Sequence, residues 1–250
     1  MLEVKGLCKK FPIEGGFFRI KGFVGAARDV SFSVAENEVL ALVGESGSGK
    51  STVGKMIQGL IAPDSGQVLF DGQDAGAMTR KERARHVQMI FQDPYSSLNP
   101  KLSVGAMLGE ALGLSGSSQT PGGLLKSVGL PPDILNDYPH QFSGGQRQRL
   151  GIARALAADP KVIVADEPVS ALDVTIQAQI LKLLLSLKNE RKISYLFITH
   201  DLSVVQSLAD RVLVMKEGGI AEQGTVKDIF ERPQDPYTKT LLAAIPRVTI

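Results

Sequence analysis

A buried strand, a glycine-rich loop and a helix follow one another at residues 38–60, and this succession constrains the fold more than any other feature. The segment "EVLALV" (38–43) has the composition of a strand that is buried on both faces. The loop "GESGSGKS" (44–51) follows it directly. Apolar residues then recur with helical spacing at Val53, Met56, Ile57 and Leu60. Such a strand–turn–helix unit is typical of a parallel α/β fold.

The same strand composition recurs later in the chain, with a helical pattern in between. The further strand candidates are "KVIVAD" (161–166), "ISYLFIT" (193–199) and "RVLVM" (211–215). Helical spacing separates the first two, at Ile176, Ile180, Leu183 and Leu187. We therefore predict a mostly parallel sheet that is covered by helices on both faces.

Two regions depart from this alternation. Residues 1–35 and 66–71 alternate as an antiparallel sheet would, with a glycine-rich loop expected at 14–27. Residues 93–158 show no convincing strand and indicate helices and turns. We predict one α/β domain of residues 1–250, with an antiparallel part at 1–35 and 66–71. Its core is expected at 36–92 and 159–250, and the helical subdomain at 93–158 is expected as an insertion.

Composition excludes several classes of protein. A chain of 250 residues suits one hydrophobic core, and a net charge of +2 gives no sign of a nucleic-acid partner or an anionic membrane surface. Cys8 is the only cysteine, which fits a reducing compartment. No apolar run approaches the ~18 residues that span a bilayer, and the N-terminus lacks a signal-peptide pattern. Any membrane role is therefore expected to come through a partner.

The glycine-rich loop matches the phosphate-binding pattern G-x-x-x-x-G-K-[ST]. Its glycines allow the backbone to wrap an anion, and the positive end of the following helix adds to the attraction. Lys50 would reach the β- and γ-phosphates of a nucleotide, and the Ser51 hydroxyl would ligate Mg²⁺. The alternative is a strand–helix turn with a solvated lysine. The predicted nucleotide-binding residues here are Gly44, Glu45, Ser46, Gly47, Ser48, Gly49, Lys50, Ser51 and Thr52.

Two adjacent carboxylates end the strand in "VIVADEP". Neighbouring residues on a strand point to opposite sides, so Asp166 would face Mg²⁺ while Glu167 would face a water as general base. The following Pro168 prevents further strand pairing. An acidic strand end in a solvated turn is the alternative.

Two more polar residues follow strand-like segments. Gln92 comes after "HVQMIF" and His200 after "LFIT". Ligands of parallel α/β sheets bind beyond the carboxyl ends of the strands, where both residues are expected. His200 could bond the γ-phosphate, and Gln92 could contact Mg²⁺ or the attacking water. A lone glutamine or histidine is more often structural.

Six motifs in order make the chain resemble the ABC transporter ATPase family. They are "GESGSGKS", "FQDP", "FSGGQRQR", "VIVADEP", "SALD" and "ITHD", and the resemblance covers nearly the whole chain. It implies a P-loop ATPase subunit that binds ATP and Mg²⁺ and hydrolyses ATP. It also implies that two such subunits hold two ATP molecules between them, head to tail.

The resemblance gives roles to three further segments. The turn at Ser143, Gly144, Gly145 and Gln146 opens a helix, and in the family it contacts the γ-phosphate that the partner subunit holds. Its alternative is an ordinary helix cap. Asp173 would lie at the dimer seam. Phe11 is the expected adenine-stacking residue, although it could be a core residue, and Phe17, Phe18 and Phe23 are rivals.

Longer matches indicate the oligopeptide, dipeptide and nickel importer group. "FQDPYSSLNP", "YPHQFSGGQRQRLGIARAL" and "PQDPYTKTLLAAIP" are most similar to its second ATPase subunit, which pairs with a related but distinct ATPase. A pair of identical chains is the other possibility. The resemblance implies two integral membrane permease subunits that contact residues 95–100. It also implies an external solute-binding protein and a place at the cytoplasmic face of the membrane.

The chain also departs from this group. Residues 113–130 are shorter and richer in Gly and Ser than their counterparts, and the C-terminal cysteine cluster of longer members is missing, so no iron–sulfur site is expected. The expected function is to power import of peptides or of chelated metal of the nickel type. A ribosome- or DNA-directed soluble ATPase and an exporter ATPase are the alternatives.

Overall fold

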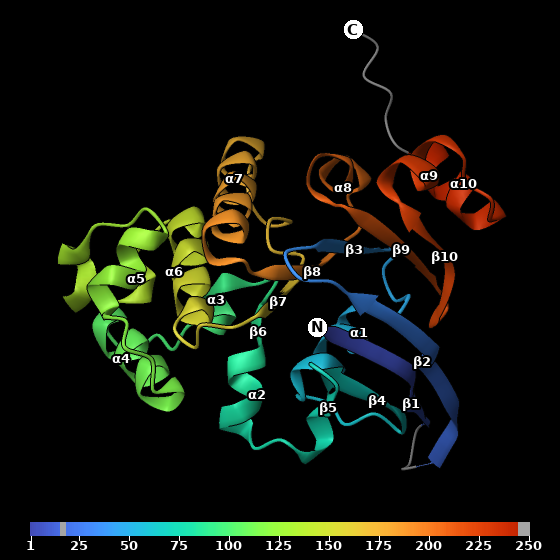
Figure 1. The fold of residues 1–250 in the computed structure, drawn as a ribbon, viewed down its shortest axis with the longest axis horizontal. Helices are drawn as coiled ribbons and strands as arrows, with labels where there is room; N and C mark the ends of the chain where they lie inside the picture. Colours follow the sequence, from blue (N-terminus) through green and yellow to red (C-terminus); the bar gives the residue numbers. More distant parts are fainter. Residues whose placement is uncertain (16–18, 245–250) are drawn as a thin grey trace, which may run out of the picture. The chain divides into compact units, whose positions relative to one another are not determined.

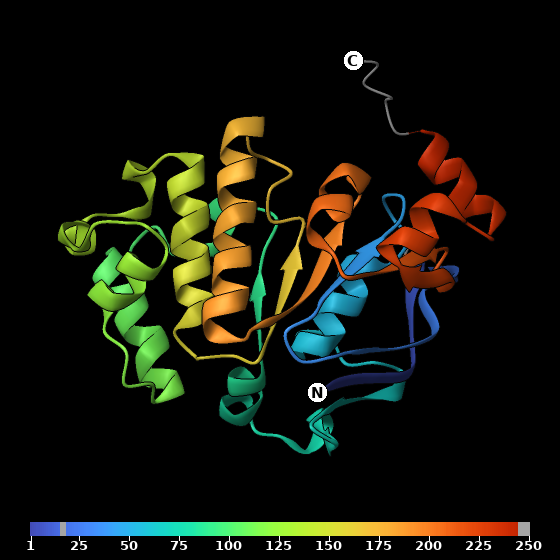
Figure 2. The ribbon, with the colours of Figure 1, turned by 45° about the horizontal axis from the view of Figure 1, so that its top comes forward.

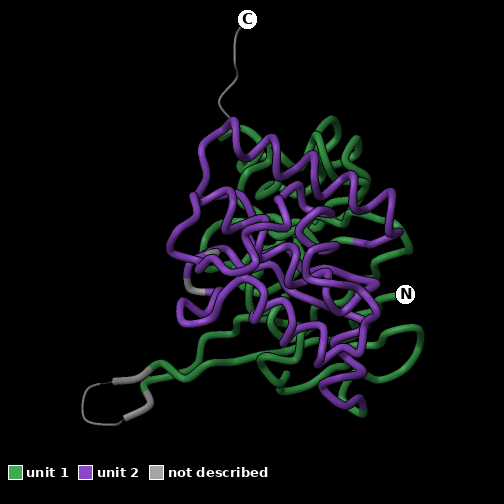
Figure 3. The backbone as a smooth tube through the Cα atoms, turned by 90° about the vertical axis from the view of Figure 1, so that its left-hand side faces the viewer, with its two compact units in different colours: residues 1–77, 195–250 green, residues 78–194 purple. Residues whose placement is uncertain are grey.

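The computed structural model describes residues 1–15 and 19–244, and the chain forms two compact units. Unit 1 combines Met1–Ala77 with the chain from Tyr195 onward, and unit 2 is Met78–Ser194 (Figure 3). None of the described helices combines the length and apolar character that crossing a lipid bilayer requires.

Unit 1 contains an antiparallel sheet and a group of mostly parallel strands with helices (Figure 1). Its elements are β1 (Leu2–Gly15), β2 (Arg19–Val34), β3 (Val39–Val43), α1 (Lys50–Gln58), β4 (Ser65–Phe70), β5 (Gln73–Asp74), η1 (Ala75–Ala77), β8 (Ser194–Thr199), α8 (Leu202–Leu208), β9 (Arg211–Lys216), β10 (Gly219–Thr225), α9 (Val226–Glu231) and α10 (Pro236–Ala243). The antiparallel sheet has the order β2-β1-β4-β5, which confirms the predicted N-terminal antiparallel part.

The outer parts of β1 and β2, beyond the pairing of β1 with β4, form a two-stranded ribbon, so the prediction of a loop over residues 14–27 is wrong. β2 begins at Arg19, and its Phe23 and Val24 pair with Pro12 and Phe11 of β1. Phe23 and Val24 are 62% and 52% exposed. The segment has the aromatic and β-branched residues of a strand and no proline, and its many glycines misled the prediction because they resemble a turn signal.

The mostly parallel strands of unit 1 have the order β10-β9-β3-β8. β3 pairs in parallel with β8 and with β9, whereas β10 pairs antiparallel with β9. Every residue of β3 and β8 is buried, as their continuous apolar sequences predicted. Val43, the last residue of β3, pairs with Thr199, the last residue of β8. The two strands therefore end together, which determines what can meet beyond them.

Helix α1 ends earlier than its apolar spacing suggested. Its last residue is Gln58, and Gly59 adopts a left-handed conformation with φ of 82° that terminates the helix. Leu60, which the spacing placed on the buried face, is 57% exposed. The terminating effect of Gly59 is thus stronger than the tendency of Leu60 to continue the apolar face of the helix.

Unit 2 consists of helices with one pair of parallel strands. Its elements are α2 (Arg80–His86), β6 (Val87–Ile90), α3 (Pro94–Ser97), α4 (Val104–Ser115), α5 (Pro121–Ser127), η2 (Pro132–Asn136), η3 (Pro139–Gln141), α6 (Gly144–Leu156), β7 (Val162–Asp166) and α7 (Val174–Arg191). Residues 93–158 contain helices and turns only, as an inserted helical part requires. Helices α6 and α7 run side by side in both views (Figures 1 and 2).

Candidate functional site

The glycine-rich loop of unit 1 lies between the end of β3 and the start of α1, as predicted. At two positions of the loop, neighbouring backbone atoms leave no room for a side chain larger than that of glycine. A Cβ atom on Gly44 would lie 2.2 Å from the carbonyl oxygen of Met215, and one on Gly49 would lie 1.9 Å from that of Ala26. Both glycines also have positive φ, 151° and 105°. The loop is therefore held against β9 and β2 in a conformation that only glycine allows.

Lys50 lies within the loop rather than in solvent. Its side chain is buried, with 5% exposed, and its ammonium donates to the carbonyl oxygens of Gly44 at 2.7 Å and Glu45 at 2.8 Å. Gly49, the N-cap of α1, is left-handed and, as a glycine, has no side chain with which to cap the helix. The N–H groups of a helix start carry partial positive charge, so the cation and the helix start together suit an anion.

His200 is placed at the same edge of the strands as the loop. Because Val43 and Thr199 are paired, Gly44 and His200 are the next residues along two neighbouring strands. His200 is exposed, whereas the six residues of β8 before it are buried. Its position is the one that the sequence predicted from the strand end.

In unit 2, the structure brings together two of the predicted polar residues. The strands β6 and β7 are parallel, and Ile90 pairs with Ala165, so the chain leaves both strands at one edge. Just beyond it, the Gln92 side-chain amide donates to the Glu167 carboxylate at 3.0 Å. Asp166 ends β7 and is 5% exposed. Sequence reasoning placed all three at strand ends but did not predict the bond between Gln92 and Glu167.

The backbone at Glu167 corrects one step of the sequence argument. Strand alternation does not orient this side chain, because β7 ends at Asp166 and Glu167 has a positive φ of 46°. A left-handed conformation is uncommon for glutamate, and a following proline normally keeps a residue extended. The turn rather than the strand therefore directs the carboxylate, towards Gln92.

The turn at residues 143–146 is a complete capping box at the start of α6. The Ser143 hydroxyl accepts from the Gln146 N–H at 3.3 Å, and the Gln146 side-chain oxygen accepts from the Ser143 N–H at 2.9 Å. A Cβ atom on Gly145 would lie 2.6 Å from a methyl group of Ile176 in α7. Gly145 thus lets α7 pack directly against the first turn of α6.

Asp173 begins the neighbouring helix in the same way. It is the N-cap of α7, and its carboxylate accepts from the Ile176 N–H at 3.0 Å. Two adjacent helices therefore start with polar N-cap residues, Ser143 on α6 and Asp173 on α7.

The segment 95–100 does not present all of its residues to solvent. Tyr95 is 56% exposed, and the Arg147 guanidinium lies 4.9 Å from the centre of its ring. Leu98 is only 2% exposed. Leu98 lies in the segment that was expected to contact the permease subunits, but its side chain belongs to the core of unit 2.

Phe11 lies on β1 and is 37% exposed, so it is not a core residue. The Lys9 ammonium lies 5.7 Å from the centre of its ring. Phe11 pairs with Val24, two residues from the Ala26 carbonyl that borders Gly49. Of its rivals, Phe23 is exposed further along the ribbon, and Phe17 and Phe18 lie outside the described residues.

Comparisons with known proteins agree with this arrangement. A family model described as "ABC transporter" matches residues 27–170. A Brucella ovis protein whose name describes it as a peptide import ATP-binding protein is 47% identical over 98% of this chain and 78% of its own length. The glutathione import ATP-binding protein GsiA of Salmonella typhi is also 47% identical over 98% of this chain, which spans 41% of that relative.

Two solved structures give the same fold. The ATP-binding cassette MJ0796, described as a dimeric post-hydrolysis state bound to ADP and Pi, has a TM-score of 0.76 at 28% identity. That match covers 90% of this chain and 99% of the cassette. CbiO1 of Clostridium perfringens, described as part of the ABC transporter complex cbiONQ, has a TM-score of 0.75 at 28% identity, over 99% of this chain and 96% of its own. The chain belongs to the ABC transporter family of ATPases.

Proposed function

We propose that this chain is the ATP-hydrolysing subunit that powers an importer of peptides. The observation that carries the proposal is the 47% identity, over 98% of the chain, to relatives named for peptide import and for glutathione import. Glutathione is itself a small peptide, so both names describe one class of solute. These relatives give no support to the chelated-metal, exporter, ribosome or DNA alternatives.

ATP is assigned to the loop of residues 44–52, with Lys50 on the β- and γ-phosphates. The inward position of Lys50 and the glycine N-cap at the start of α1 support this assignment. Ser51, Gln92 and Asp166 are assigned to Mg²⁺, because a hydroxyl, an amide oxygen and a carboxylate are the oxygen ligands that this ion prefers. Bound Mg²⁺ would neutralise phosphate charge.

Hydrolysis is assigned to Glu167 as the general base, with His200 on the γ-phosphate. The bond from Gln92 to Glu167 supports a directed carboxylate, because it holds the side chain of the base just beyond the ends of β6 and β7. Gln92 then has two tasks, since its amide nitrogen holds Glu167 while its amide oxygen is available to the ion.

Two subunits are proposed to close head to tail around two ATP molecules. The capping box at Ser143–Gln146 gives the turn a fixed shape, with which it would contact the γ-phosphate of the partner subunit. Asp173 is assigned to the seam and Phe11 to adenine. The partner is either a second copy of the chain or a related second ATPase subunit.

The membrane contact is assigned to the exposed part of residues 95–100, above all Tyr95. Two integral permease subunits would hold the ATPase at the cytoplasmic face of the membrane, and an external solute-binding protein would deliver the peptide to them. The exposure of Tyr95 and its contact with Arg147 on α6, the helix that the Ser143–Gln146 turn begins, support a role in coupling.

The test is peptide uptake in the organism that encodes the chain. Cells that lack the gene should fail to take up radiolabelled di- and tripeptides, glutathione included. The wild-type gene should restore uptake, and a Glu167→Gln gene expressed to the same level should not. Normal peptide uptake in the deleted strain, under conditions where the gene is expressed in wild-type cells, would overturn the proposal.

A further inference from the structure

Residue Tyr237 contacts the phosphate loop from a distant part of the sequence. It lies on α10, and its hydroxyl oxygen accepts a hydrogen bond from the Glu45 N–H at 3.1 Å. The two residues are 192 positions apart, and both belong to unit 1. The sequence resemblance included this tail but assigned it no task.

The position of Tyr237 is fixed independently of that bond. It packs against a buried cluster that includes Val43 of β3 and Val214 of β9. The Lys216 ammonium lies 4.9 Å from the ring centre. The hydroxyl is therefore presented to the loop by a ring that other contacts already hold.

Helix α10 is in turn fastened to β10. The Glu222 carboxylate of β10 accepts from the backbone N–H groups of Gln234 at 2.8 Å and Asp235 at 3.1 Å. Asp235 then caps the helix by accepting from the Tyr237 N–H at 2.7 Å. A continuous set of hydrogen bonds thus runs from the edge strand β10, through the start of α10, to the phosphate loop.

The bond from Glu45 determines the orientation of one particular peptide group. The Glu45 N–H and the Gly44 carbonyl belong to the same planar peptide. At one end of this plane, the carbonyl accepts from the Lys50 ammonium at 2.7 Å, and at the other end the N–H donates to Tyr237. If this peptide rotated, the N–H dipole would turn towards Lys50 and the lysine would lose an acceptor.

We propose that Tyr237 is a positioning residue for nucleotide binding, which keeps the Gly44–Glu45 peptide turned so that Lys50 stays aligned in the phosphate loop. This inference rests on the proposed role of that loop. It adds α10 to the machinery, because the tail helix would hold the loop ready before the phosphates arrive. Glu45 is exposed, so water could accept a hydrogen bond from its N–H in place of Tyr237. The bond to Tyr237 therefore acts by orienting the peptide group, not by satisfying a buried N–H.

The test removes only the hydroxyl. In the full-length chain, Tyr237→Phe should weaken binding of the fluorescent nucleotide MANT-ATP roughly five- to tenfold, the usual worth of one hydrogen bond. Thr240→Val is the matched control, because the Thr240 hydroxyl lies on the same helix and donates to the Pro236 carbonyl instead. It should bind as the wild type does. Lys50→Ala should show no measurable binding.

A second measurement separates positioning from a loss of structure. By amide hydrogen exchange, Tyr237→Phe should speed exchange at Glu45 while the amides of α10 keep wild-type protection. Faster exchange throughout α10 would show that the hydroxyl only docks the helix, which would overturn the inference. Wild-type nucleotide affinity in Tyr237→Phe, with binding lost in Lys50→Ala, would overturn the inference but leave the phosphate loop. Wild-type affinity in Lys50→Ala would overturn the loop assignment itself.

Discussion

At the scale of single residues, Glu167 shows how a local conformation directs a functional group. Its left-handed backbone, directly before Pro168, is uncommon, because such a conformation costs on the order of 1–3 kcal/mol and persists only where the surroundings hold it. The contact with Gln92 is one such restraint. A straight continuation of β7 would point the carboxylate by strand alternation, whereas the turn points it at Gln92, two residues beyond the end of β6. Its strained backbone agrees with its assignment as the base.

Two neighbouring side chains, Tyr95 and Leu98, should respond differently to truncation. Leu98→Ala removes a side chain that is 2% exposed, so it should lower the free energy of unfolding by about 2–5 kcal/mol. Tyr95→Ala removes an exposed ring and one stacking contact with Arg147, so the loss should stay below about 1 kcal/mol. Urea unfolding of both variants checks this.

The Tyr95→Ala variant also tests coupling to the membrane subunits. It should bind nucleotide with wild-type affinity. Its ATP hydrolysis should, however, no longer be stimulated when it is assembled with the membrane subunits. Transport at the wild-type rate with Tyr95→Ala would place the membrane contact elsewhere on unit 2.

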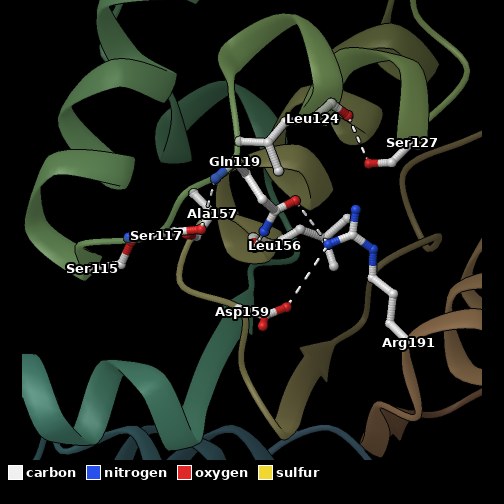
Figure 4. Close-up of polar contacts among 9 residues, drawn as sticks. All are labelled: Ser115, Ser117, Gln119, Leu124, Ser127, Leu156, Ala157, Asp159 and Arg191. Atoms are coloured by element: carbon white, nitrogen blue, oxygen red, sulfur yellow. Dashed lines mark hydrogen bonds and ion pairs between the residues drawn. The ribbon is translucent and has the colours of Figure 1, made fainter.

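At the scale of elements, α6 and α7 are fastened to each other at their far ends (Figure 4). The Gln119 side-chain amide donates to the Leu156 carbonyl at the end of α6, at 3.2 Å, and its oxygen accepts from Arg191 at the end of α7, at 2.9 Å. The Ser115 hydroxyl donates to the Ala157 carbonyl at 2.9 Å. The serine- and glycine-rich segment therefore caps α6, whose other end carries Ser143.

Removing the Gln119 amide should destabilise the chain measurably. Gln119→Ala leaves the Leu156 carbonyl and the Arg191 guanidinium without this partner, so we expect a loss of about 1–3 kcal/mol in urea unfolding. Ser118→Ala is the matched control, because Ser118 is the adjacent residue and is exposed. Equal unfolding midpoints for the two variants would contradict the capping role.

Buried strands could be predicted from the sequence, whereas contacts between distant segments could not. β3 and β7 lie within one residue of the predicted segments, because continuous apolar runs have few other solutions in a soluble fold. The glycine-rich half of β2 was missed, since glycine signals turns as readily as it tolerates an exposed ribbon. The bonds of Gln119 and Tyr237 join segments 37 and 192 residues away, and no local pattern marks them.

At the scale of the whole molecule, both units should lose stability in acid. The Lys9 side chain, by its hydrogen bond, holds the pKa of Asp64 in unit 1 below its ordinary value of 3.8. The Thr79 hydroxyl does the same for the pKa of Glu82 in unit 2, below 4.5. A folded-state pKa below the unfolded value means that the carboxylate stabilises the fold above the unfolded pKa, and that this is lost as the pH falls through the folded pKa.

The melting temperature should therefore be nearly constant from pH 7 to about pH 5 and should fall below about pH 4.5. The double variant Asp64→Asn with Glu82→Gln should start lower and decline less steeply. Thermal melts by circular dichroism between pH 3 and pH 7 measure both curves. Parallel declines for the variant and the wild type would show that these two carboxylates do not contribute.

The assembled transporter gives the sharpest test of the hydrolytic assignment, through Glu167→Gln. The amide keeps the size of the side chain and its ability to bond Gln92, but it cannot accept a proton from water.

ATP should still bind and draw two ATPase subunits together, while hydrolysis falls by roughly 10²–10⁴-fold. The closed pair should then last longer, and ATP rather than ADP should be recovered from the altered site. The experiment needs the complete complex, because a chain whose natural partner is a different ATPase would stay unpaired by itself. Hydrolysis at the wild-type rate would remove Glu167 from the role of base and leave His200, at the end of β8, as the next residue to replace.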